Sequence, residues 1–260
     1  MVAACQSEAA LVRRSLHLQY RDTTPVGQLW GGHAYGQDII LLRSGMGAER
    51  ATGAATWLVQ HYALHGLLSV GFAGGLQAAL ATGDTLLPQQ VLAWSGDLDG
   101  ANPIPTTPLR TDASLARLAT LSANQAHLRQ HQGTLLTVPA VLLHATTKRY
   151  LGQRSGALAA DMESYSIGQV AVAHAIPFMP LRTIFDTCDA DIPLQVKKFI
   201  SADGVVRPIR VLCALASHPG ACLHIVPMWW QAQCAGHALV SWLRHFLPRL
   251  RQRMPSQEDR

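Results

Sequence analysis

The sequence ALAADMESYSIG at residues 157–168 joins a run of small apolar residues to a segment with helical spacing, and two acids lie between them. The run at 157–160 predicts a buried strand. One face of a helix follows at Ile167, Val170, Ala171 and His174. Burying a charge without a partner is costly. Asp161 and Glu163 therefore indicate a functional or structural requirement at the end of this strand.

Further strand-like and helix-like segments alternate along the chain. Apolar runs occur at 2–5, 39–42, 67–71, 135–138 and 178–185. Helical spacing occurs at Ala51, Ala54, Ala55, Leu58, Val59 and Tyr62, and again at Leu115, Leu118, Leu121 and Leu128. This alternation predicts an α/β fold in three layers, with a mainly parallel sheet covered by helices on both faces. Ligands of such sheets bind at the carboxyl ends of the strands.

The composition indicates a globular protein of a reducing compartment. The chain has 260 residues, of which 48% are hydrophobic and 14% charged. Its 5 cysteines form no C-x-x-C pair and show no metal-ligand spacing with the 12 histidines, so no structural zinc is expected. The opening MVAACQSEAALVRR lacks a basic region followed by a long apolar run. We therefore expect no signal peptide and a cytoplasmic protein.

The net charge of +5 is concentrated at the C-terminal end. Residues 1–191 carry 12 Lys and Arg against 13 Asp and Glu, whereas residues 192–260 carry 9 against 3. The sequence contains no module that interleaves aromatic and basic residues, so no nucleic-acid partner is expected. We expect one α/β domain over 1–191 and a basic, helical extension over 192–260, packed on or beside it.

The C-terminal extension leaves two interpretations open. Residues 211–243 carry no Asp, Glu, Lys or Arg, but prolines and polar residues interrupt them, which does not favour a membrane span. Trp229, Trp230 and Trp242 precede the basic run RHFLPRLRQR. This pattern suits an interfacial helix on anionic lipid, making the protein membrane-associated. It equally suits a helix packed on its own domain with a solvated basic end.

Two glycine clusters and three sets of acids follow strand-like segments. SGMG at 44–47 and VGFAGGL at 70–76 allow close approach of backbone N–H groups to a ligand, or form tight turns. Neither matches a dinucleotide-binding or P-loop pattern. Asp161 and Glu163, Asp186 and Glu8 each follow a strand-like run. Taken singly, each acid suits a solvated surface or a helix cap, and Asp161 suits a cap best. Taken together, they predict one cleft suited to acid–base chemistry.

Four motifs in order carry a family resemblance. They are SGMGAERA (44–51), VGFAGGLQAALATGDTLLP (70–88), ALAADMES (157–164) and PLRTIFD (180–186). Their order and spacing resemble the nucleoside phosphorylase and nucleosidase superfamily. AACQSEAALVRR (3–14) resembles its methylthioadenosine/S-adenosylhomocysteine nucleosidase branch. ADGVVRPIRVLCALASHPG (202–220) and the tail are similar to hopanoid-associated members, which act on adenosylhopane.

The resemblance implies a role for several residues. Glu163 would bind the ribose hydroxyls, Asp186 would donate a proton or hydrogen bond to purine N7, and Glu8 would position the attacking water. Substrate-binding positions implied in the same way are Met162 on the sugar, Phe72, Ala73 and Gly74 at the glycine-rich turn, and Gly45 with Met46 on the side of the 5′-substituent. The resemblance implies neither metal nor organic cofactor, and a homodimer. Lys148, near the expected base platform, suits a solvated helix start.

Elementary chemistry agrees with these roles. Cleavage of an N-ribosidic bond passes through a ribosyl cation, which a carboxylate at the ribose hydroxyls stabilises. Adenine leaves more easily once an acid protonates N7. A carboxylate such as Glu8 would repel phosphate but accept a proton from water. Ser69 and Phe72 stand where phosphorylases of the superfamily carry an arginine and a hydroxyl, although Arg13, Arg43 or Arg182 could rebuild an anion site.

We therefore expect an enzyme that cleaves the N-ribosidic bond of a 5′-substituted adenosine and releases adenine. The substrate expected from the second resemblance is adenosylhopane, a lipid-linked nucleoside that the C-terminal segment would meet at a membrane surface. Alternatives are phosphorolysis of a purine nucleoside and the methylthioadenosine/S-adenosylhomocysteine nucleosidase reaction. A further alternative is a non-catalytic scaffold, which Phe72 and Phe185 favour because they replace polar residues of the family.

Overall fold

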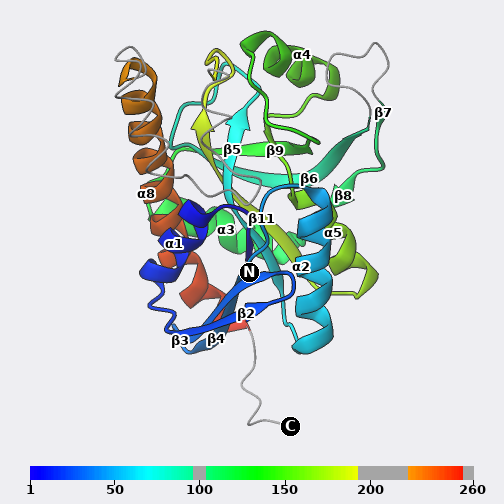
Figure 1. Ribbon diagram of the computed structural model, residues 1–260, viewed down its shortest axis with the longest axis vertical. Helices are drawn as coiled ribbons and strands as arrows, with labels where there is room; N and C mark the ends of the chain where they lie inside the picture. The colour runs from blue at the N-terminus through cyan, green and yellow to red at the C-terminus, as the bar shows by residue number, and fades with distance from the viewer. Residues whose placement is uncertain (96–103, 193–221, 254–260) are drawn as a thin grey trace.

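The computed structural model describes residues 1–95, 104–192 and 222–253, where a mixed sheet lies between helices (Figure 1). The strands are β1 (Val2–Ala3), β2 (Tyr20–Thr24), β3 (Gly27–Ala34), β4 (Gln37–Arg43), β5 (Leu67–Gly75), β6 (Thr85–Ser95), β7 (Ile104–Pro105), β8 (Leu109–Arg110), β9 (Gln130–Thr137), β10 (Ala159–Asp161) and β11 (Phe178–Asp186). The helices are α1 (Gln6–Ser15), α2 (Ala48–His61), α3 (Ala113–Gln125), α4 (Ala145–Ser155), α5 (Ser164–Ala173) and α8 (Cys222–Arg253). The predicted α/β class is confirmed.

The sheet has the order β10-β9-β6-β11-β5-β1-β4-β3-β2. β5 runs parallel to β1 and to β11, and β9 runs parallel to β6 and β10. β10 also pairs antiparallel with the end of β5, which closes β5, β11, β6, β9 and β10 into a ring. β2, β3 and β4 form an antiparallel meander, since two-residue turns join only antiparallel strands. The sheet is therefore mixed, with parallel pairs around β5.

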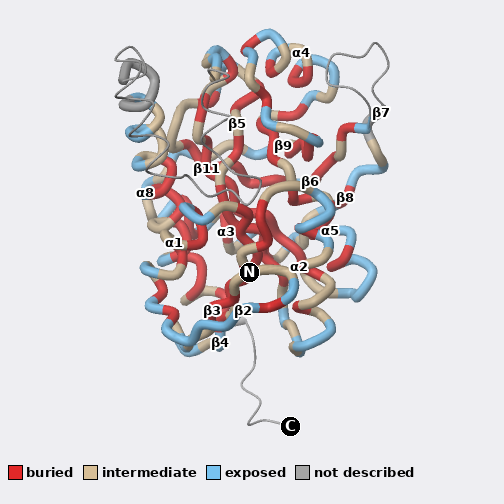
Figure 2. The backbone as a smooth tube through the Cα atoms, viewed as in Figure 1, coloured by how far each residue is buried: buried red, intermediate tan, exposed pale blue. Residues whose placement is uncertain are grey.

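Helices cover both faces of the sheet, as the three-layer prediction requires. On one face α1, α3 and α8 bury residues such as Val12, Leu115 and Leu239 against the sheet. On the other face α2 and α5 bury Leu58 and Ile167. Figure 2 shows the buried segments gathered between these helices, along the central strands. The two cores hold β5 from both sides, so its carboxyl end is a rigid place for a site.

Helix α8 packs on the domain through its second half. Trp242 is fully buried and its Nε1 donates to the carbonyl of Ala119 at 2.9 Å. Of the two interpretations left open, packing on its own domain holds for Trp242, because its ring belongs to the core. Trp229 and Trp230 remain 63% and 57% exposed in the first half of the helix. None of the described helices is long and apolar enough to cross a membrane.

The predicted domain boundary at residue 191 stays a prediction. Residues 193–221 lie outside the described residues, and so do the hopanoid-like motif at 202–220 and the first part of the uncharged segment. Within the described part, α8 contacts α1, α3 and β11. Thr183 of β11 donates its hydroxyl to the carbonyl of Ala235 at 3.0 Å. Helix α8 thus packs directly on the strand that ends at Asp186.

Candidate active site

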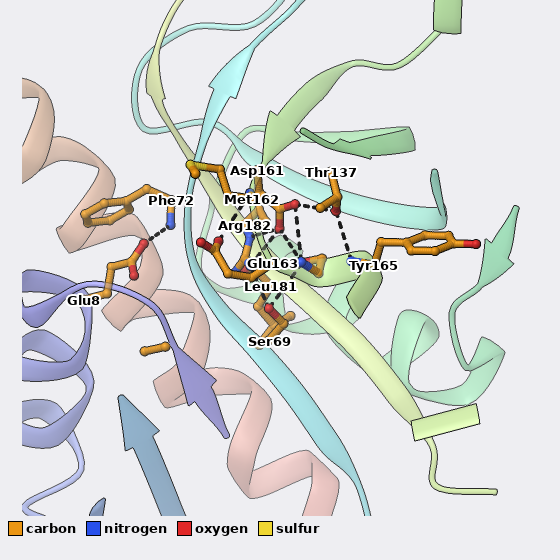
Figure 3. A network of polar contacts seen from close by, with 12 residues as sticks. Glu8, Ser69, Phe72, Thr137, Asp161, Met162, Glu163, Tyr165, Leu181 and Arg182 are labelled. Atoms are coloured by element: carbon orange, nitrogen blue, oxygen red, sulfur yellow. Dashed lines mark hydrogen bonds and ion pairs between the residues drawn. The ribbon is translucent and has the colours of Figure 1, made fainter. Parts of the chain in front are cut away.

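Glu8 reaches the end of β5 from the first turn of α1. Its Oε1 accepts from the backbone N–H of Phe72 at 2.7 Å (Figure 3). Its Oε2 accepts from Cys5 N–H at 2.8 Å. A side chain at Gly71 would collide with this carboxyl group, so glycine allows α1 to approach β5 closely. Burial raises the pKa of Glu8, while Arg182 and the backbone N–H groups oppose the rise.

Glu163 lies at the junction of β10 and α5. Its Oε1 accepts from Gly47 N–H at 2.9 Å, and its Oε2 accepts from Met162 N–H at 3.3 Å. Gly47 has a φ of +101°, which glycine adopts without strain. Gly45 and Met46 belong to the same turn, and Gly45 N–H donates to the Ala4 carbonyl at 3.1 Å. The turn after β4 therefore lies beside Glu163, and the substrate-binding role of Gly45 and Met46 stays a prediction.

The environment of Glu163 shifts its titration to near-neutral pH. Burial, and then the charge of Asp161, raise its pKa to about 8, while Arg182 and the Gly47 N–H oppose the rise. Glu8 also raises the pKa of Glu163, so the two carboxyl groups are near enough to repel each other. A bound sugar that donates hydrogen bonds, or a cationic transition state, would favour the ionised form of Glu163.

Glu163→Gln is expected to change how stability depends on pH. The folded-state pKa of Glu163 is raised to about 8 from 4.5, so the folded protein holds this proton more tightly than the unfolded chain does. The resulting stabilisation is fully present below the unfolded pKa and is lost as pH rises through the folded pKa. Glutamine does not titrate. The Tm of the variant, relative to the wild type, should therefore rise by a few degrees between about pH 6 and about pH 8.5.

Thermal unfolding followed by circular dichroism at both pH values measures this difference. Glu49→Gln is the matched control, because Glu49 is an exposed carboxyl group in the first turn of α2. The control should follow the wild type at both pH values. Identical pH dependence in the Glu163→Gln variant and the wild type would contradict the raised pKa.

Asp161 belongs to a buried ion pair behind Glu163. Its Oδ2 accepts from Arg182 Nε at 2.9 Å and Nη2 at 2.8 Å. Its Oδ1 accepts from the Thr137 hydroxyl at 2.7 Å, and Ser164 N–H lies 3.2 Å from Oδ2. The predicted helix-capping contact is thus present at Ser164, but the helix cap position itself is Glu163. The main partner of Asp161 is Arg182, which answers why an acid is buried here.

Arg182 joins this network through Nε and Nη2, while its Nη1 lies 3.5 Å from the Leu181 carbonyl. Its Nη2 also donates to Ser69 Oγ at 2.6 Å and to Ser164 Oγ at 3.0 Å, and its side chain is 3% exposed. The expectation that Arg182 could rebuild an anion site therefore lacks support in the structure. Instead, this cation connects β5, β11 and α5 beneath the candidate site and partly offsets the negative charge of Glu8 and Glu163.

Asp186 ends β11 beside β5. Its Oδ1 lies 3.2 Å from the point where a Cβ on Gly74 would stand, so glycine there leaves room around the carboxyl group. Its Oδ2 accepts from Lys148 of α4. Burial raises the pKa of Asp186 above that of an ordinary aspartate, while Lys148 opposes the rise. A raised pKa is what a carboxylic acid needs in order to donate a proton near neutral pH.

The structure brings the sequence-predicted residues together at the end of β5. Glu8 binds Phe72, Asp186 lies beside Gly74, and Ala160 of β10 pairs with Gly74 just before Glu163. The remaining predicted positions are Ala73, which is buried in β5, and Met162, Phe72 and Met46, which are partly exposed. Three acids distant in sequence thus surround one segment of backbone, as convergence at strand ends predicted. Their individual roles stay predictions.

Two features of the site were missed by the sequence analysis. Lys148 is 1% exposed rather than solvated, because Ala145 and Leu151, three residues to either side, are buried on the same face of α4. The spacing of these apolar residues in the sequence could have predicted that Lys148 is buried. The Phe72 and Phe185 rings lie side by side with centroids 5.9 Å apart. They form an apolar pair next to the acids where a polar lining was the family expectation.

Three buried carboxyl groups thus lie beside glycine-rich turns, on Glu8 in the first turn of α1, on Glu163 after β10 and on Asp186 at the end of β11, an arrangement that suits acid–base chemistry. The comparisons agree. The chain belongs to the phosphorylase superfamily, whose family model matches residues 1–217. This confirms the family resemblance and the prediction of an enzyme of the nucleosidase and nucleoside phosphorylase class. The hopanoid-associated branch stays a prediction.

Known relatives are nucleosidases. A 5′-methylthioadenosine/S-adenosylhomocysteine nucleosidase of Shewanella sediminis is 25% identical over 228 residues, covering 83% of this chain and 97% of its own. A protein of the same name from Halalkalibacterium halodurans is 24% identical and covers 79% of this chain and 92% of its own. The chain therefore spans nearly the whole length of these relatives.

Solved structures share the fold. The Helicobacter pylori 5′-methylthioadenosine/S-adenosylhomocysteine nucleosidase superposes with a TM-score of 0.74 at 19% identity, over 95% of this chain and 96% of its own. The futalosine hydrolase of Helicobacter pylori gives a TM-score of 0.74 at 18% identity, over the same shares of both chains. At these identities the likeness establishes the fold alone. Members of this fold carry more than one nucleoside specificity.

Proposed function

We propose that the protein hydrolyses the N-ribosidic bond of a 5′-substituted adenosine and releases adenine. The observation that carries the proposal is the meeting of Glu8, Glu163 and Asp186 around residues 71–75 of β5. Family membership and the names of the nucleosidase relatives support the same reaction. Each carboxyl group has a different environment, which suits three different roles.

Glu163 would act on the sugar and Asp186 on the base. The carboxylate of Glu163 would accept hydrogen bonds from the ribose hydroxyls and favour the positive charge that develops on the sugar. Asp186 would carry a proton, kept by burial, and transfer it to N7 as the bond to the sugar breaks. Neutral adenine then leaves with the electron pair of that bond.

Water is the nucleophile that the contacts of Glu8 favour. In this chain the Phe72 N–H, in the glycine-rich turn, donates to Glu8 and is not free for an anion. Arg182 is buried and donates through Nε and Nη2 to Asp161, Ser69 and Ser164. The Glu8 carboxylate would repel a phosphate dianion, whereas it could accept a proton from a water molecule. Phosphorolysis therefore has less support than hydrolysis.

The 5′-substituent is proposed to be a large apolar group, as in adenosylhopane. The Phe72 and Phe185 rings supply an apolar surface beside the acids, and α8 packs on the same strand at Thr183. Trp229 and Trp230 extend exposed aromatic surface along the first half of α8. Apolar surface of this kind suits the body of a lipid better than a small thioether.

Membrane contact is proposed through Trp229 and Trp230 alone. Arg244 and Arg251, which are exposed, lie in the other half of α8. At about 1.5 Å per residue, Arg244 is roughly 22 Å along the helix axis from Trp229, so aromatic and basic residues do not form one compact interfacial patch. A cytoplasmic protein that visits the membrane surface to take its substrate is consistent with this arrangement. The homodimer stays an expectation from the family resemblance.

Adenine release from two nucleosides, with and without phosphate, tests the proposal. The full-length protein is incubated with adenosylhopane in detergent and with methylthioadenosine, and adenine and the sugar product are identified by mass spectrometry. We expect adenine from adenosylhopane at a kcat/KM at least about tenfold above that for methylthioadenosine. The product should be the free sugar, and phosphate should not change the rate.

Each contrary outcome identifies one of the alternatives. A sugar 1-phosphate formed only with phosphate would establish phosphorolysis. Turnover of methylthioadenosine alone would rule out the lipid-linked substrate. It would favour the methylthioadenosine/S-adenosylhomocysteine nucleosidase reaction, for which the relatives are named. No adenine from either nucleoside would favour the non-catalytic scaffold or a different nucleoside, such as that of the futalosine hydrolase neighbour.

A further inference from the structure

Lys148 is a buried cation to which the reaction outlined above assigns no role. It projects from α4, and its side chain is 1% exposed. Its ammonium group donates to Asp186 Oδ2, to the Ala190 carbonyl at 2.7 Å and to the Thr187 carbonyl at 3.2 Å. An ammonium group has three N–H bonds, so these acceptors satisfy it completely. One of the three is the carboxyl group of the expected acid.

The two oxygens of Asp186 consequently have different surroundings. Oδ2 is bound by Lys148, whereas Oδ1 faces the end of β5 at Gly74. The absent side chain of Gly74 leaves room on the Oδ1 side. Glu8 contacts the same end of β5 through Phe72 N–H, and Glu163 contacts the turn after β4 through Gly47 N–H. A carboxyl group fixed at one oxygen cannot rotate freely, so Oδ1 keeps one direction.

We propose that Lys148 is a positioning residue for Asp186, which binds Oδ2, directs Oδ1 at the purine, and stabilises the carboxylate that forms when Oδ1 gives up its proton. This inference rests on the proposed function. As the bond between sugar and base breaks, its electron pair goes to the base and the Oδ1 proton moves to N7. Asp186 becomes an anion at that moment. A preorganised cation next to a developing anion lowers the barrier.

Other charged groups around Asp186 are engaged elsewhere. Asp189 pairs with Arg149 at 2.5 Å, and Asp191 Oδ1 accepts from Ala145 N–H at 2.7 Å. β5 presents glycine to Asp186, and Cys188 lies next to Asp189. Lys148 is the charged side chain that lowers the pKa of Asp186 against the effect of burial. Removing Lys148 should therefore raise the pKa of Asp186 further.

Lys148→Met, Lys148→Arg and Arg149→Met together test the proposal. For Lys148→Met we expect kcat for adenine release to fall about a hundredfold, with KM changed by less than about threefold. The alkaline limb of the kcat/KM profile, where the acid loses its proton, should move to higher pH by about one unit or more. Lys148→Arg keeps the positive charge, but the larger guanidinium group does not match the positions of the three acceptors. It should therefore lose activity, and its alkaline limb should stay in place.

Arg149→Met is the matched control. Arg149 neighbours Lys148 on α4 and ties the same loop through Asp189, but it does not touch Asp186. If holding the loop were the whole function of Lys148, this control would lose activity as well. We expect its kcat and pH profile to match the wild type within about twofold.

If Lys148→Met alone is unstable, a double variant tests the inference instead. Lys148→Met combined with Asp186→Asn removes both charges, and its kcat should equal that of Asp186→Asn within about threefold. A further hundredfold loss would mean that Lys148 acts independently of Asp186 and would overturn the inference. The inference would also be overturned if the wild type is active and Lys148→Met has the same kcat and the same alkaline limb as the wild type. If the wild type releases no adenine at all, the proposed function fails, and this inference fails with it.

Discussion

Asp186→Asn is expected to lower kcat for adenine release by about a hundredfold to ten-thousandfold, the range for loss of a positioned acid. Asparagine keeps an oxygen to accept from Lys148 but has no acidic proton for N7. The barrier then rises because the base must leave as an anion. KM should change much less than kcat, since the lost interaction forms mainly in the transition state. Steady-state kinetics with adenine detection measures both constants.

Asp189→Asn is the matched control for this substitution. Asp189 lies three residues further along the chain and pairs with the exposed Arg149 at the surface. Its substitution should leave kcat within about twofold of the wild type, because exposed ion pairs contribute little. If Asp186→Asn retained full kcat while remaining folded, the assignment of Asp186 as the acid would be wrong. A nucleoside with a much better leaving group should lose less on Asp186→Asn, because it needs less protonation.

Glu8→Gln is expected to reduce kcat by about a hundredfold or more, because glutamine cannot accept a proton from water. The side chain is held by two N–H donors, from Cys5 and Phe72, and the amide group of glutamine can accept from only one of them through its oxygen. The other N–H would face an NH₂ group. The variant should therefore also lose some thermal stability, which differential scanning calorimetry would detect.

Binding of a substrate analogue separates the two effects of Glu8→Gln. If the variant binds the analogue within about threefold of the wild type while kcat falls a hundredfold, the base role is supported. If analogue binding and kcat fall together, Glu8 serves mainly to shape the end of β5. Glu49→Gln again controls for removal of a carboxylate, because Glu49 is exposed. An unchanged kcat in Glu8→Gln would remove Glu8 from the mechanism.

The central strands were predictable from the sequence because they are apolar on both faces. The runs at 2–5, 39–42, 67–71, 135–138 and 178–185 all overlap strands of the structure. β2 was missed because four of its five residues are exposed, so it carries no apolar signal. β6 was not predicted, and its apolar residues are interrupted by Pro88, Gln89 and Gln90. The pairing of β6 with β9 shifts register between Pro88 and Gln90, which accommodates that proline.

Site residues that follow strands could be predicted from the sequence. Contacts between side chains of elements distant in the sequence could not. Glu8, Glu163 and Asp186 each lie just after or at the end of a strand, so their convergence followed from the topology. Asp161 was expected mainly to cap a helix, and its ion pair with Arg182 was not foreseen. The sequence alone does not reveal which strands are neighbours. The same difficulty hid the contact between Lys148 and Asp186, which are 38 residues apart.

The position of β5 among its neighbours has a consequence for synthesis of the protein. β5 (Leu67–Gly75) pairs with β1, which leaves the ribosome first, and also with β10 (Ala159–Asp161) and β11 (Phe178–Asp186), which are synthesised much later. A nascent chain that has released only the first half can form the β1–β5 pair but lacks Glu163 and Asp186. If Glu163 and Asp186 act as proposed, a complete binding site exists only after residue 186 has emerged. On the same proposal, substrate would stabilise only the later steps of folding, after β10 and β11 have paired with β5.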